Sequence, residues 1–363
     1  MRVLHAAETI KGGVATVLRQ LMISQQDSND IRSVTCLVPD DQVEEVNSIR
    51  PEHIVTFHRD GRNFSSFVRF FFGFASLVIK SKPDIVHLHS TFGGVLGRIA
   101  LIFLWPVRRP KVIYCPHAFS FLMQGSVRKR KIFSFVEKML IGMTDAIICV
   151  SEYERDKAIT YGFPSNKLHV IYNGVPVVES EVQLASPYRD NVINLLFVGR
   201  FDYQKGFDIL ASAMTRLKGL PFHLTAVGGS VHSKDEIAKT VPQPTYTGWL
   251  KAEALAPYFQ HADVLVIPSR WEGFAMVPLE AMSYGLPVIA SNCTSFPEMI
   301  DEHRTGLLFD LQYPEMLASY LTDTPQEQWE LMGKEAKKLF LSKFTADKMI
   351  KNTADLYKAV LGI

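Results

Sequence analysis

Short apolar runs alternate with longer amphipathic stretches along most of the chain. Runs of about four to eight residues rich in Val, Ile and Leu are typical of parallel strands buried on both faces. Six such runs come first, at 2–8, 33–39, 84–90, 111–117, 145–151 and 167–173, and five follow, at 193–199, 222–228, 244–249, 262–268 and 286–292. Segments of helical length, such as 13–25, 208–218 and 279–284, separate them. The pattern predicts an α/β fold with parallel sheets.

A polar stretch with two prolines, residues 176–191, separates the two series of strands. We interpret it as the linker between two doubly wound domains, 1–178 and 190–344. The 363 residues of the chain fit this number, since domains typically contain about 100–200 residues. Residues 345–363 predict one more helix, which could belong to either domain and would complete the first if it packs there.

Composition excludes several classes of protein. With 47% hydrophobic residues the chain is not a disordered one. Its four cysteines are scattered, which argues against a disulfide framework or a structural zinc site and fits a reducing cytosol. The first residues lack the long apolar core of a secretory signal, so we expect no export. Residues 64–79 and 95–107 are apolar, but each is shorter than the roughly 20 residues of a membrane-spanning helix and each contains an arginine.

The formal net charge of +2 hides an uneven distribution. Residues 57–140 contain 14 basic and 3 acidic residues, a surplus of +11. Aromatic residues are interleaved with these cations, a combination suited to the headgroup region of an anionic bilayer. Nucleic acid is the rival partner, but no recognition motif accompanies the charge. A third interpretation is that the basic residues form an ordinary solvated face and that the phenylalanines beneath them belong to the core.

Ligands of open α/β sheets bind at the carboxyl ends of strands, so the loops there carry the candidate chemistry. Gly12 and Gly13 lie between the first strand and a helix, where they permit close approach of a ligand or simply form a tight turn. The G-x-G-x-x-G and P-loop spacings are absent, which argues against dinucleotide dehydrogenases and P-loop NTPases.

A second loop, after the run 193–199, contains Arg200 and Lys205. A planar guanidinium and a mobile ammonium together suit a diphosphate, although both could be solvated surface cations.

The segment 268–291 is the most informative. Pro278 is favoured in a first helical turn, so the helix should begin near Val277 or Pro278 and place Glu280 within that turn. The amides of Phe274–Val277 would then face an anion. Glu272 and Glu280 would flank this helix start, either as dipole caps or as acceptors for sugar hydroxyls.

Glu272-x7-Glu280, preceded by a strand and Pro-Ser, resembles the signature of retaining glycosyltransferases of family 4, which have the GT-B fold. The Gly199–Gly206 loop is similar to that family's diphosphate-binding element, and the likeness extends over nearly the whole chain. It implies two Rossmann-like domains facing a central cleft, with an N-terminal acceptor-binding and a C-terminal donor-binding domain.

The resemblance also implies roles for individual residues. Arg200 and Lys205 would hold the diphosphate, Glu280 would bind the ribose, and Glu272 would contact the transferred sugar. Gly273, Phe274, Ala275, Met276 and Val277 would orient that sugar, with Ala275 standing where the family often has glycine. Gly12 and Gly13 would approach the donor, or a phosphate on the acceptor.

His117 matches the family's active-site histidine, whereas the residues alone leave a buried structural role equally open. The resemblance therefore implies His117, Glu272, Arg200 and Lys205 as catalytic residues. His87 and His89 straddle a strand end, and we expect one to face inward and the other to face the neighbouring layer, with His89 a candidate for the site.

The function implied is retaining transfer of a hexose from a nucleotide diphosphate sugar to an acceptor hydroxyl, without metal or cofactor. A glycosidase is disfavoured because Arg200 and Lys205 would lack a role. A UDP-sugar is favoured over a GDP-sugar as donor, and the acceptor is expected to be a lipid-linked saccharide of polysaccharide or lipopolysaccharide synthesis. The enzyme would then be cytoplasmic and peripheral at the inner face of the cell membrane. The alternatives are a transferase using a small soluble sugar or sugar phosphate, and an inactive sugar-nucleotide-binding protein.

Overall fold

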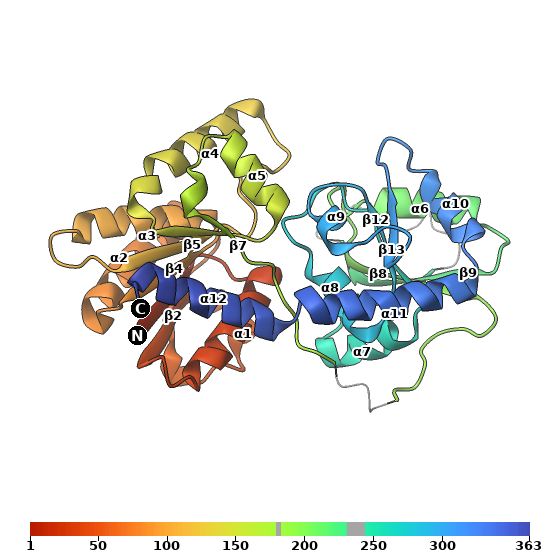
Figure 1. The fold of residues 1–363 in the computed structure, drawn as a ribbon, viewed down its shortest axis with the longest axis horizontal. Coiled ribbons are helices and arrows are strands. Elements are labelled where there is room, and N and C mark those ends of the chain that lie inside the picture. The colour runs from red at the N-terminus through yellow and green to blue at the C-terminus, as the bar shows by residue number, and fades with distance from the viewer. Residues whose placement is uncertain (179–182, 231–243) are drawn as a thin grey trace. The chain divides into compact units, whose positions relative to one another are not determined.

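A computed structural model describes residues 1–178, 183–230 and 244–363 of the chain (Figure 1). These residues form two compact units, one made of Met1–Asn173 with Ala346–Ile363 and the other of Gly174–Thr345. The helix expected at the end of the sequence, α12 (Ala346–Leu361), therefore belongs to the N-terminal unit. Residues 179–182 of the expected linker lie outside the described residues.

The N-terminal unit contains a seven-stranded parallel sheet in the order β3-β2-β1-β4-β5-β6-β7. Its strands are β1 (Arg2–Ala7), β2 (Ser33–Pro39), β3 (Ile54–Phe57), β4 (Ile85–His89), β5 (Lys111–Cys115), β6 (Ala146–Cys149) and β7 (Leu168–Val170). Its helices are α1 (Gly13–Gln26), α2 (Phe64–Ser81), α3 (Thr91–Leu104), α4 (Val127–Met139), α5 (Glu152–Thr160) and α12.

Two different layers cover this sheet. Alternate strand residues such as Leu4, Val86 and Tyr114 form a buried apolar cluster with Phe70 and Phe74 of α2, and α3 contributes to the same cluster. On the other side α12 packs beside α1 (Figure 1). The intervening strand positions, which include His5 and His87, therefore belong to the α1 and α12 side.

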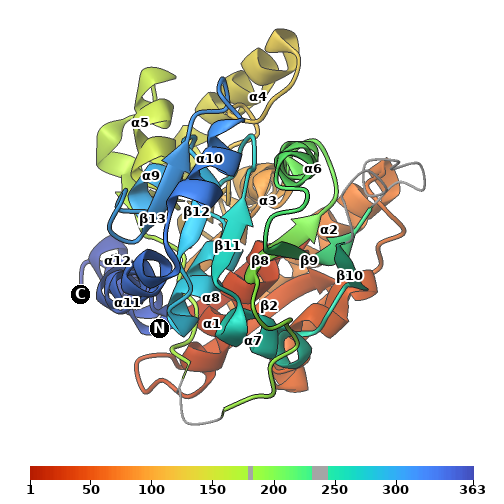
Figure 2. The ribbon, with the colours of Figure 1, turned by 90° about the vertical axis from the view of Figure 1, so that its right-hand side faces the viewer.

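The second unit contains a six-stranded parallel sheet in the order β10-β9-β8-β11-β12-β13. The strands are β8 (Ile193–Arg200), β9 (Phe222–Gly229), β10 (Thr245–Gly248), β11 (Val264–Ile267), β12 (Val288–Ser291) and β13 (Gly306–Phe309). The helices are α6 (Phe207–Arg216), α7 (Ala252–His261), α8 (Met276–Tyr284), α9 (Phe296–Met299), α10 (Met316–Asp323) and α11 (Gln326–Lys343). Within this unit α6 packs on α10, and α8 packs on both α7 and α11 (Figure 2).

All eleven apolar runs of the sequence form strands, so the α/β fold class with two parallel sheets is confirmed. The sequence pattern missed β3 and β13. Both have only four residues and lie at the edge of a sheet, and such a short apolar run cannot be told from other structure by its pattern alone.

Strand order reverses once in each sheet, between β1 and β4 and between β8 and β11. At such a point the chain leaves adjacent strands in opposite directions and opens a crevice at their carboxyl ends, where α/β proteins bind ligands. The loops after β8 and β11 contain Lys205 and Glu272, the loops after β1 and β4 contain Gly12 and Ser90, and Gly13 begins α1.

Among the described residues, α2 is the one helix whose length and apolarity would allow it to cross a membrane, and 22% of its 18 residues are buried. Asn63 caps its N-terminus by accepting a hydrogen bond from Ser66 N at 2.9 Å. Its buried positions Phe70, Phe74 and Val78 recur every four residues and pack on the sheet. One face of α2 is therefore apolar and packs against the core of the N-terminal unit.

Candidate functional site

The second unit brings Lys205 and Glu272 together at the point where its strand order reverses. Lys205 Nζ lies 2.6 Å from Glu272 Oε1, and both side chains are largely buried, with exposures of 22% and 10%. The backbone N–H of Lys205 donates to Asp202 Oδ1 at 2.9 Å, which fixes the loop that carries the ammonium group. A cation and a carboxylate are therefore held together in the crevice.

Arg200, at the end of β8, lies on the same loop but has other partners. Its Nη2 donates to Gln204 Oε1 at 2.8 Å and lies 3.2 Å from Asp202 Oδ2. The side chain remains 40% exposed, so the guanidinium is available to a ligand. Gln204 also donates to the carbonyl of Trp271 at 3.3 Å, which connects the loop after β8 to the loop after β11.

Arg270 strengthens the connection between these two loops. Its guanidinium donates to both carboxylate oxygens of Asp208, each at 2.7 Å, and to the carbonyl of Tyr203 at 2.7 Å. It also lies 3.8 Å from the centre of the Tyr203 ring. The ion pair lowers the pKa of Asp208 although burial opposes this. This pair could not be predicted from the sequence, because 62 residues separate its members.

Gly206 is required where the loop enters α6. Its φ of +66° is left-handed, and a Cβ at this position would lie 1.9 Å from the carbonyl oxygen of Pro268. Only glycine permits the loop after β8 to approach the loop after β11 so closely.

The helix after Glu272 begins earlier than expected. Helix α8 starts at Met276 with Ala275 as its N-cap, so the expected start at Val277 or Pro278 is one or two residues late. Glu280 therefore lies in the second turn, and its expected place in the first turn is wrong. Pro278 remains in the first turn, where its missing N–H costs no hydrogen bond. The amides of Met276 and Val277 belong to the positive end of the helix.

The other residues of this loop are differently placed. Phe274 and Ala275 are buried, and the Phe274 ring lies 5.8 Å from that of Phe344. Gly273 is half-buried beside Glu272. The loop after β12 supports them, since Thr294 Oγ1 accepts from Glu272 N at 3.3 Å and Ser291 Oγ donates to the Ser269 carbonyl.

His117 lies in the N-terminal unit as part of a chain of three histidines. Its Nε2 is 2.9 Å from His89 Nδ1, and His89 Nε2 is 3.0 Å from His5 Nδ1. Burial lowers the pKa of His5 and of His117 to about 4, and it holds the pKa of His89 well below the usual value. The three rings are therefore neutral at pH 7.

His87 and His89 do not face opposite layers, so that expectation is wrong. Residues two apart on a strand share a face, and the two rings stack with their centres 4.1 Å apart. Both are buried, and His87 Nδ1 lies 2.6 Å from the hydroxyl of Tyr357 on α12.

His5, His87 and His89 form the one group among the described residues whose ligand atoms could hold a metal ion, all within 4.8 Å of one another. A metal binds in the plane of an imidazole ring, along a nitrogen lone pair. Rings stacked at 24° direct their lone pairs side by side, and in the hydrogen bond between His5 and His89 one ring donates its N–H to the lone pair of the other. The arrangement therefore fits a hydrogen-bonded network better than a metal centre.

Gly12 is the N-cap of α1 and has a φ of +68°, so a side chain there would be strained even though the surrounding space is open. Gly13 begins the helix. Nearby, the carboxylate of Glu8 is completely buried and lies 3.2 Å from Arg59 Nε. Arg62 Nε, on a half-exposed side chain, is 3.5 Å from the second oxygen of Glu8. This end of β1 thus has a rigid charged lining.

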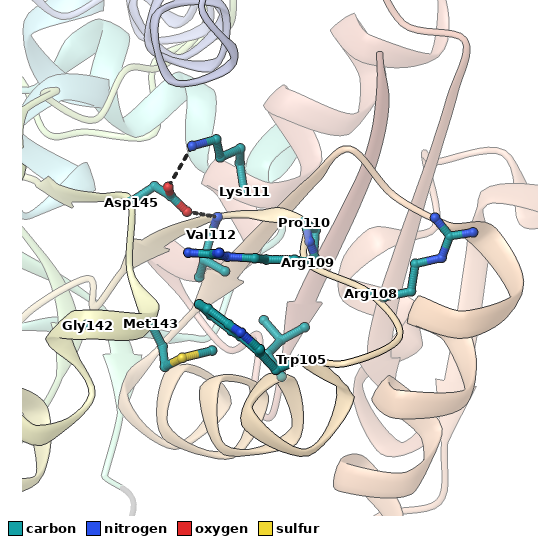
Figure 3. A pocket seen from close by; sticks show the side chains of 10 residues that line it. Trp105, Arg108, Arg109, Pro110, Lys111, Val112, Gly142, Met143 and Asp145 are labelled. Atoms are coloured by element: carbon teal, nitrogen blue, oxygen red, sulfur yellow. Dashed lines mark hydrogen bonds and ion pairs between the residues drawn. The ribbon is translucent and has the colours of Figure 1, made fainter.

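A surface pocket of about 270 Å³ lies at the other end of the same sheet (Figure 3). The guanidinium of Arg109 stacks on Trp105 at 3.8 Å, and Lys111 Nζ pairs with Asp145 Oδ1 at 3.0 Å. Arg108 points away from this group in Figure 3. Because Lys111 begins β5 while His117 follows its end, the pocket is separate from the residues of the candidate site.

Three residues of the histidine network were not among the predicted site residues: His5, Gln25 and Tyr357. His5 interrupts an apolar strand and could have been noticed as a polar residue in a buried run. Gln25 and Tyr357 lie on helices with no motif around them, so only the fold brings them to the histidines.

Two family models match the chain. Residues 11–179 match the model described as Glycosyltransferase Family 4, and residues 192–324 match the one described as Glycosyl transferases group 1. A 41.2 kDa protein of the cps region of Klebsiella pneumoniae is 35% identical over 99% of this chain and 100% of its own length.

More distant relatives extend the comparison. The UDP-Gal:alpha-D-GlcNAc-diphosphoundecaprenol alpha-1,3-galactosyltransferase of Escherichia coli is 25% identical over 77% of this chain and 76% of its own. The solved structure of sucrose-phosphate synthase from Thermosynechococcus elongatus covers both chains completely, with a TM-score of 0.81 and 21% identity. With its two parallel-sheet units and these matches, the chain belongs to the glycosyltransferases of family 4, which have the GT-B fold.

Proposed function

We propose that the protein transfers a hexose from a nucleotide diphosphate sugar to a hydroxyl of a lipid-linked saccharide, with retention of anomeric configuration and without a metal ion. The observation that carries the proposal is the Lys205–Glu272 pair where the strand order of the second unit reverses. The Gly174–Thr345 unit is accordingly the donor-binding domain, and the Met1–Asn173 unit with α12 is the acceptor-binding domain.

Lys205 and Arg200 would bind the diphosphate. On binding, a phosphate oxygen replaces Glu272 as the partner of Lys205, and the released carboxylate accepts hydrogen bonds from the sugar hydroxyls. As the bond to the sugar breaks, negative charge grows on the diphosphate, and fixed cations stabilise it there. The amides at the start of α8, from Phe274 to Val277, add the positive end of a helix dipole.

Glu280 would bind the ribose hydroxyls from the second turn of α8. A uridine donor is favoured over a guanosine donor, and the Escherichia coli relative is named for its use of UDP-Gal. In the family mechanism the leaving phosphate takes the proton of the acceptor hydroxyl on the face that it leaves. The charge requirement of that step is met by Arg200 and Lys205, so the proposal needs no metal.

The acceptor is proposed to be lipid-linked because α2, α3 and α4 expose large apolar side chains among cations. Phe72 and Phe103 are 66% and 72% exposed, and both neighbour Phe71, whose ring lies 6.2 Å from that of Phe103. Helix α4 adds Ile132 and Phe135, both more than 60% exposed. Such a surface fits the inner face of the cell membrane, where the aromatic side chains insert and the basic residues of 57–140 meet anionic headgroups.

The activity is tested with the purified full-length chain. A thermal-shift screen of UDP- and GDP-sugars identifies the donor, and release of nucleoside diphosphate in the absence of acceptor measures its hydrolysis. Transfer is then followed to a polyprenyl-diphosphate-linked sugar and to a free sugar phosphate. Transfer to the lipid-linked acceptor supports the proposal. Transfer to the free sugar phosphate alone identifies the small-molecule enzyme, and donor binding without turnover identifies the inactive binding protein.

A further inference from the structure

A hydrogen-bonded chain runs through the interior of the N-terminal unit from α1 to the end of β5. It begins at Gln25, whose Oε1 lies 2.8 Å from His5 Nε2. It continues over the two contacts from His5 to His89 and from His89 to His117, at 3.0 and 2.9 Å. Gln25, His5 and His89 are buried, so water does not compete for these bonds.

If the three rings are neutral, the donor and the acceptor of each hydrogen bond in this series are determined. A carboxamide oxygen only accepts, so His5 Nε2 carries the proton and His5 Nδ1 carries a lone pair. His89 Nε2 must then donate to His5, which leaves His89 Nδ1 as an acceptor. His117 Nε2 donates to it in turn, and the lone pair of His117 is on Nδ1.

The direction of the series depends on which atom of the Gln25 amide faces His5. That atom is Oε1, 2.8 Å from His5 Nε2, and an amide oxygen only accepts. The hydroxyl of Tyr357 lies 2.6 Å from His87 Nδ1, and His87 Nε2 is a buried atom without a partner among the described residues.

His117, at the other end of this hydrogen-bonded series, is partly accessible to solvent. His117 is half-buried, and within the part of the chain that the structure describes Nδ1 has no hydrogen-bond partner. His117 and Ala118 have φ values of 56° and 142°, and Ser90 after β4 has a φ of 65°. Non-glycine residues with such backbone angles are strained, and they are concentrated at functional sites.

We infer that Gln25 is a positioning residue that fixes the tautomers of His5, His89 and His117, so that His117 offers the lone pair of Nδ1 to a sugar hydroxyl. The hydroxyl in question belongs to the substrate of the transferase, so this part rests on the proposed function. The tautomer order does not, because it follows from the Gln25–His5–His89–His117 hydrogen bonds alone.

The tautomers can be measured directly on the full chain labelled with 15N-histidine. Long-range proton–nitrogen correlation spectra at pH 7.5 in the presence of EDTA distinguish Nδ1–H from Nε2–H, and the His117→Asn variant assigns the signals of His117. The expected result is protonation of His117 on Nε2. Protonation on Nδ1 would overturn the inference, since it requires the reverse direction at every link. So would Zn²⁺ binding that removes the N–H signals of His5 and His89 when EDTA is omitted.

Gln25→Met removes both polar atoms at nearly constant length, and Gln26→Met on the same helix is the matched control. In Gln25→Met the His117 Nδ1–H form should become populated, and kcat/KM for transfer should fall about tenfold, the effect of losing one hydrogen bond. Gln26→Met should match the wild type in both. A wild-type tautomer in a folded Gln25→Met protein would refute the role of Gln25.

The two proposals fail differently. If the wild-type tautomer is as expected but no sugar nucleotide is turned over, the proposed function fails and the tautomer relay stands. If transfer occurs and His117 carries its proton on Nδ1, the relay fails and the transferase stands.

Discussion

Lys205 Nζ and Glu272 Oε1 lie 2.6 Å apart although 67 residues separate them in the sequence. The contact exists because β8 and β11 are neighbours in the sheet and both chain segments leave at their carboxyl ends. Without a ligand the two charges neutralise each other. A bound diphosphate would instead find an ammonium group already held at the crevice, beside the exposed guanidinium of Arg200.

Replacing Lys205 or Arg200 with alanine should reduce transfer by at least a hundredfold, because each removes a cation from the developing charge of the leaving group. The proteins should remain folded, since neither residue belongs to the buried core. Transfer rates and melting temperatures are measured together. Arg155→Ala, which removes a partly exposed cation on α5, is the control and should be fully active. Near-normal rates in both site variants would contradict the diphosphate assignment.

Glu280→Ala should weaken nucleoside diphosphate binding by about tenfold or more, because the ribose loses a carboxylate acceptor. Isothermal titration calorimetry with UDP and GDP measures this change. Glu335→Ala on α11 removes a partly exposed carboxylate of the same unit, paired with Lys338, and should leave the affinity unchanged. An unaltered affinity in Glu280→Ala would restrict Glu280 to a role within the helix.

Membrane binding can be tested on the aromatic side chains of α2 and α3. The wild-type chain should float with vesicles containing phosphatidylglycerol and not with vesicles of phosphatidylcholine alone. Phe72→Ser with Phe103→Ser should abolish flotation, while Leu331→Ser, an equivalent change at an exposed position of α11, should not. If the wild type fails to bind anionic vesicles even at low salt, the membrane proposal is refuted.

The buried ion pair of Arg98 and Glu137 should dominate the stability of the N-terminal unit. Arg98 Nη2 lies 2.6 Å from Glu137 Oε2, Tyr114 donates to the other carboxylate oxygen at 2.8 Å, and both charged side chains are almost fully buried. Glu137→Gln should cost about 3–5 kcal/mol in the free energy of unfolding, because the guanidinium is left without a counter-charge. Lys351→Ala breaks an exposed pair and should cost less than about 1 kcal/mol.

The histidine network should make unfolding depend on pH. The pKa of His5 and of His117 is about 4 in the folded chain, below the ordinary 6.5, so between these values the unfolded chain binds more protons. The stability is therefore fully present above pH 6.5 and is lost as the pH falls towards 4, with His5 contributing on the order of 3 kcal/mol. Urea unfolding at pH 5, 6 and 7 measures the slope.

The matched variants for this experiment are His117→Asn and His303→Asn. Both positions have a left-handed backbone, with φ of 56° and 62°, which asparagine tolerates well. His117→Asn should show a smaller pH slope than the wild type, and the exposed His303→Asn should match it. Equal slopes in all three proteins would show that His117 does not titrate as described.

The sequence predicted the parts of the fold that depend on local pattern. The apolar runs identified all strands except β3 and β13. The Glu272-x7-Glu280 spacing identified α8, the helix that follows the Lys205–Glu272 pair. It could not predict the exact start of α8, because both Met276 and Val277 suit a first turn and Ala275 offers no capping side chain. The sequence could not predict the histidine network either, since Gln25 meets His5 and Tyr357 meets His87 only through the packing of α1 and α12 on the sheet.

Helix α12 carries a consequence for the order of folding. Tyr357 is buried against the first sheet, and Lys358 reaches Asp30 at 2.7 Å, yet these residues leave the ribosome after the whole of the second unit. The first unit is thus the first to be synthesised and the last to be completed. Until then the face of its sheet that α1 and α12 cover together is only partly covered, which gives a nascent chain the time and the exposed surface to engage a chaperone.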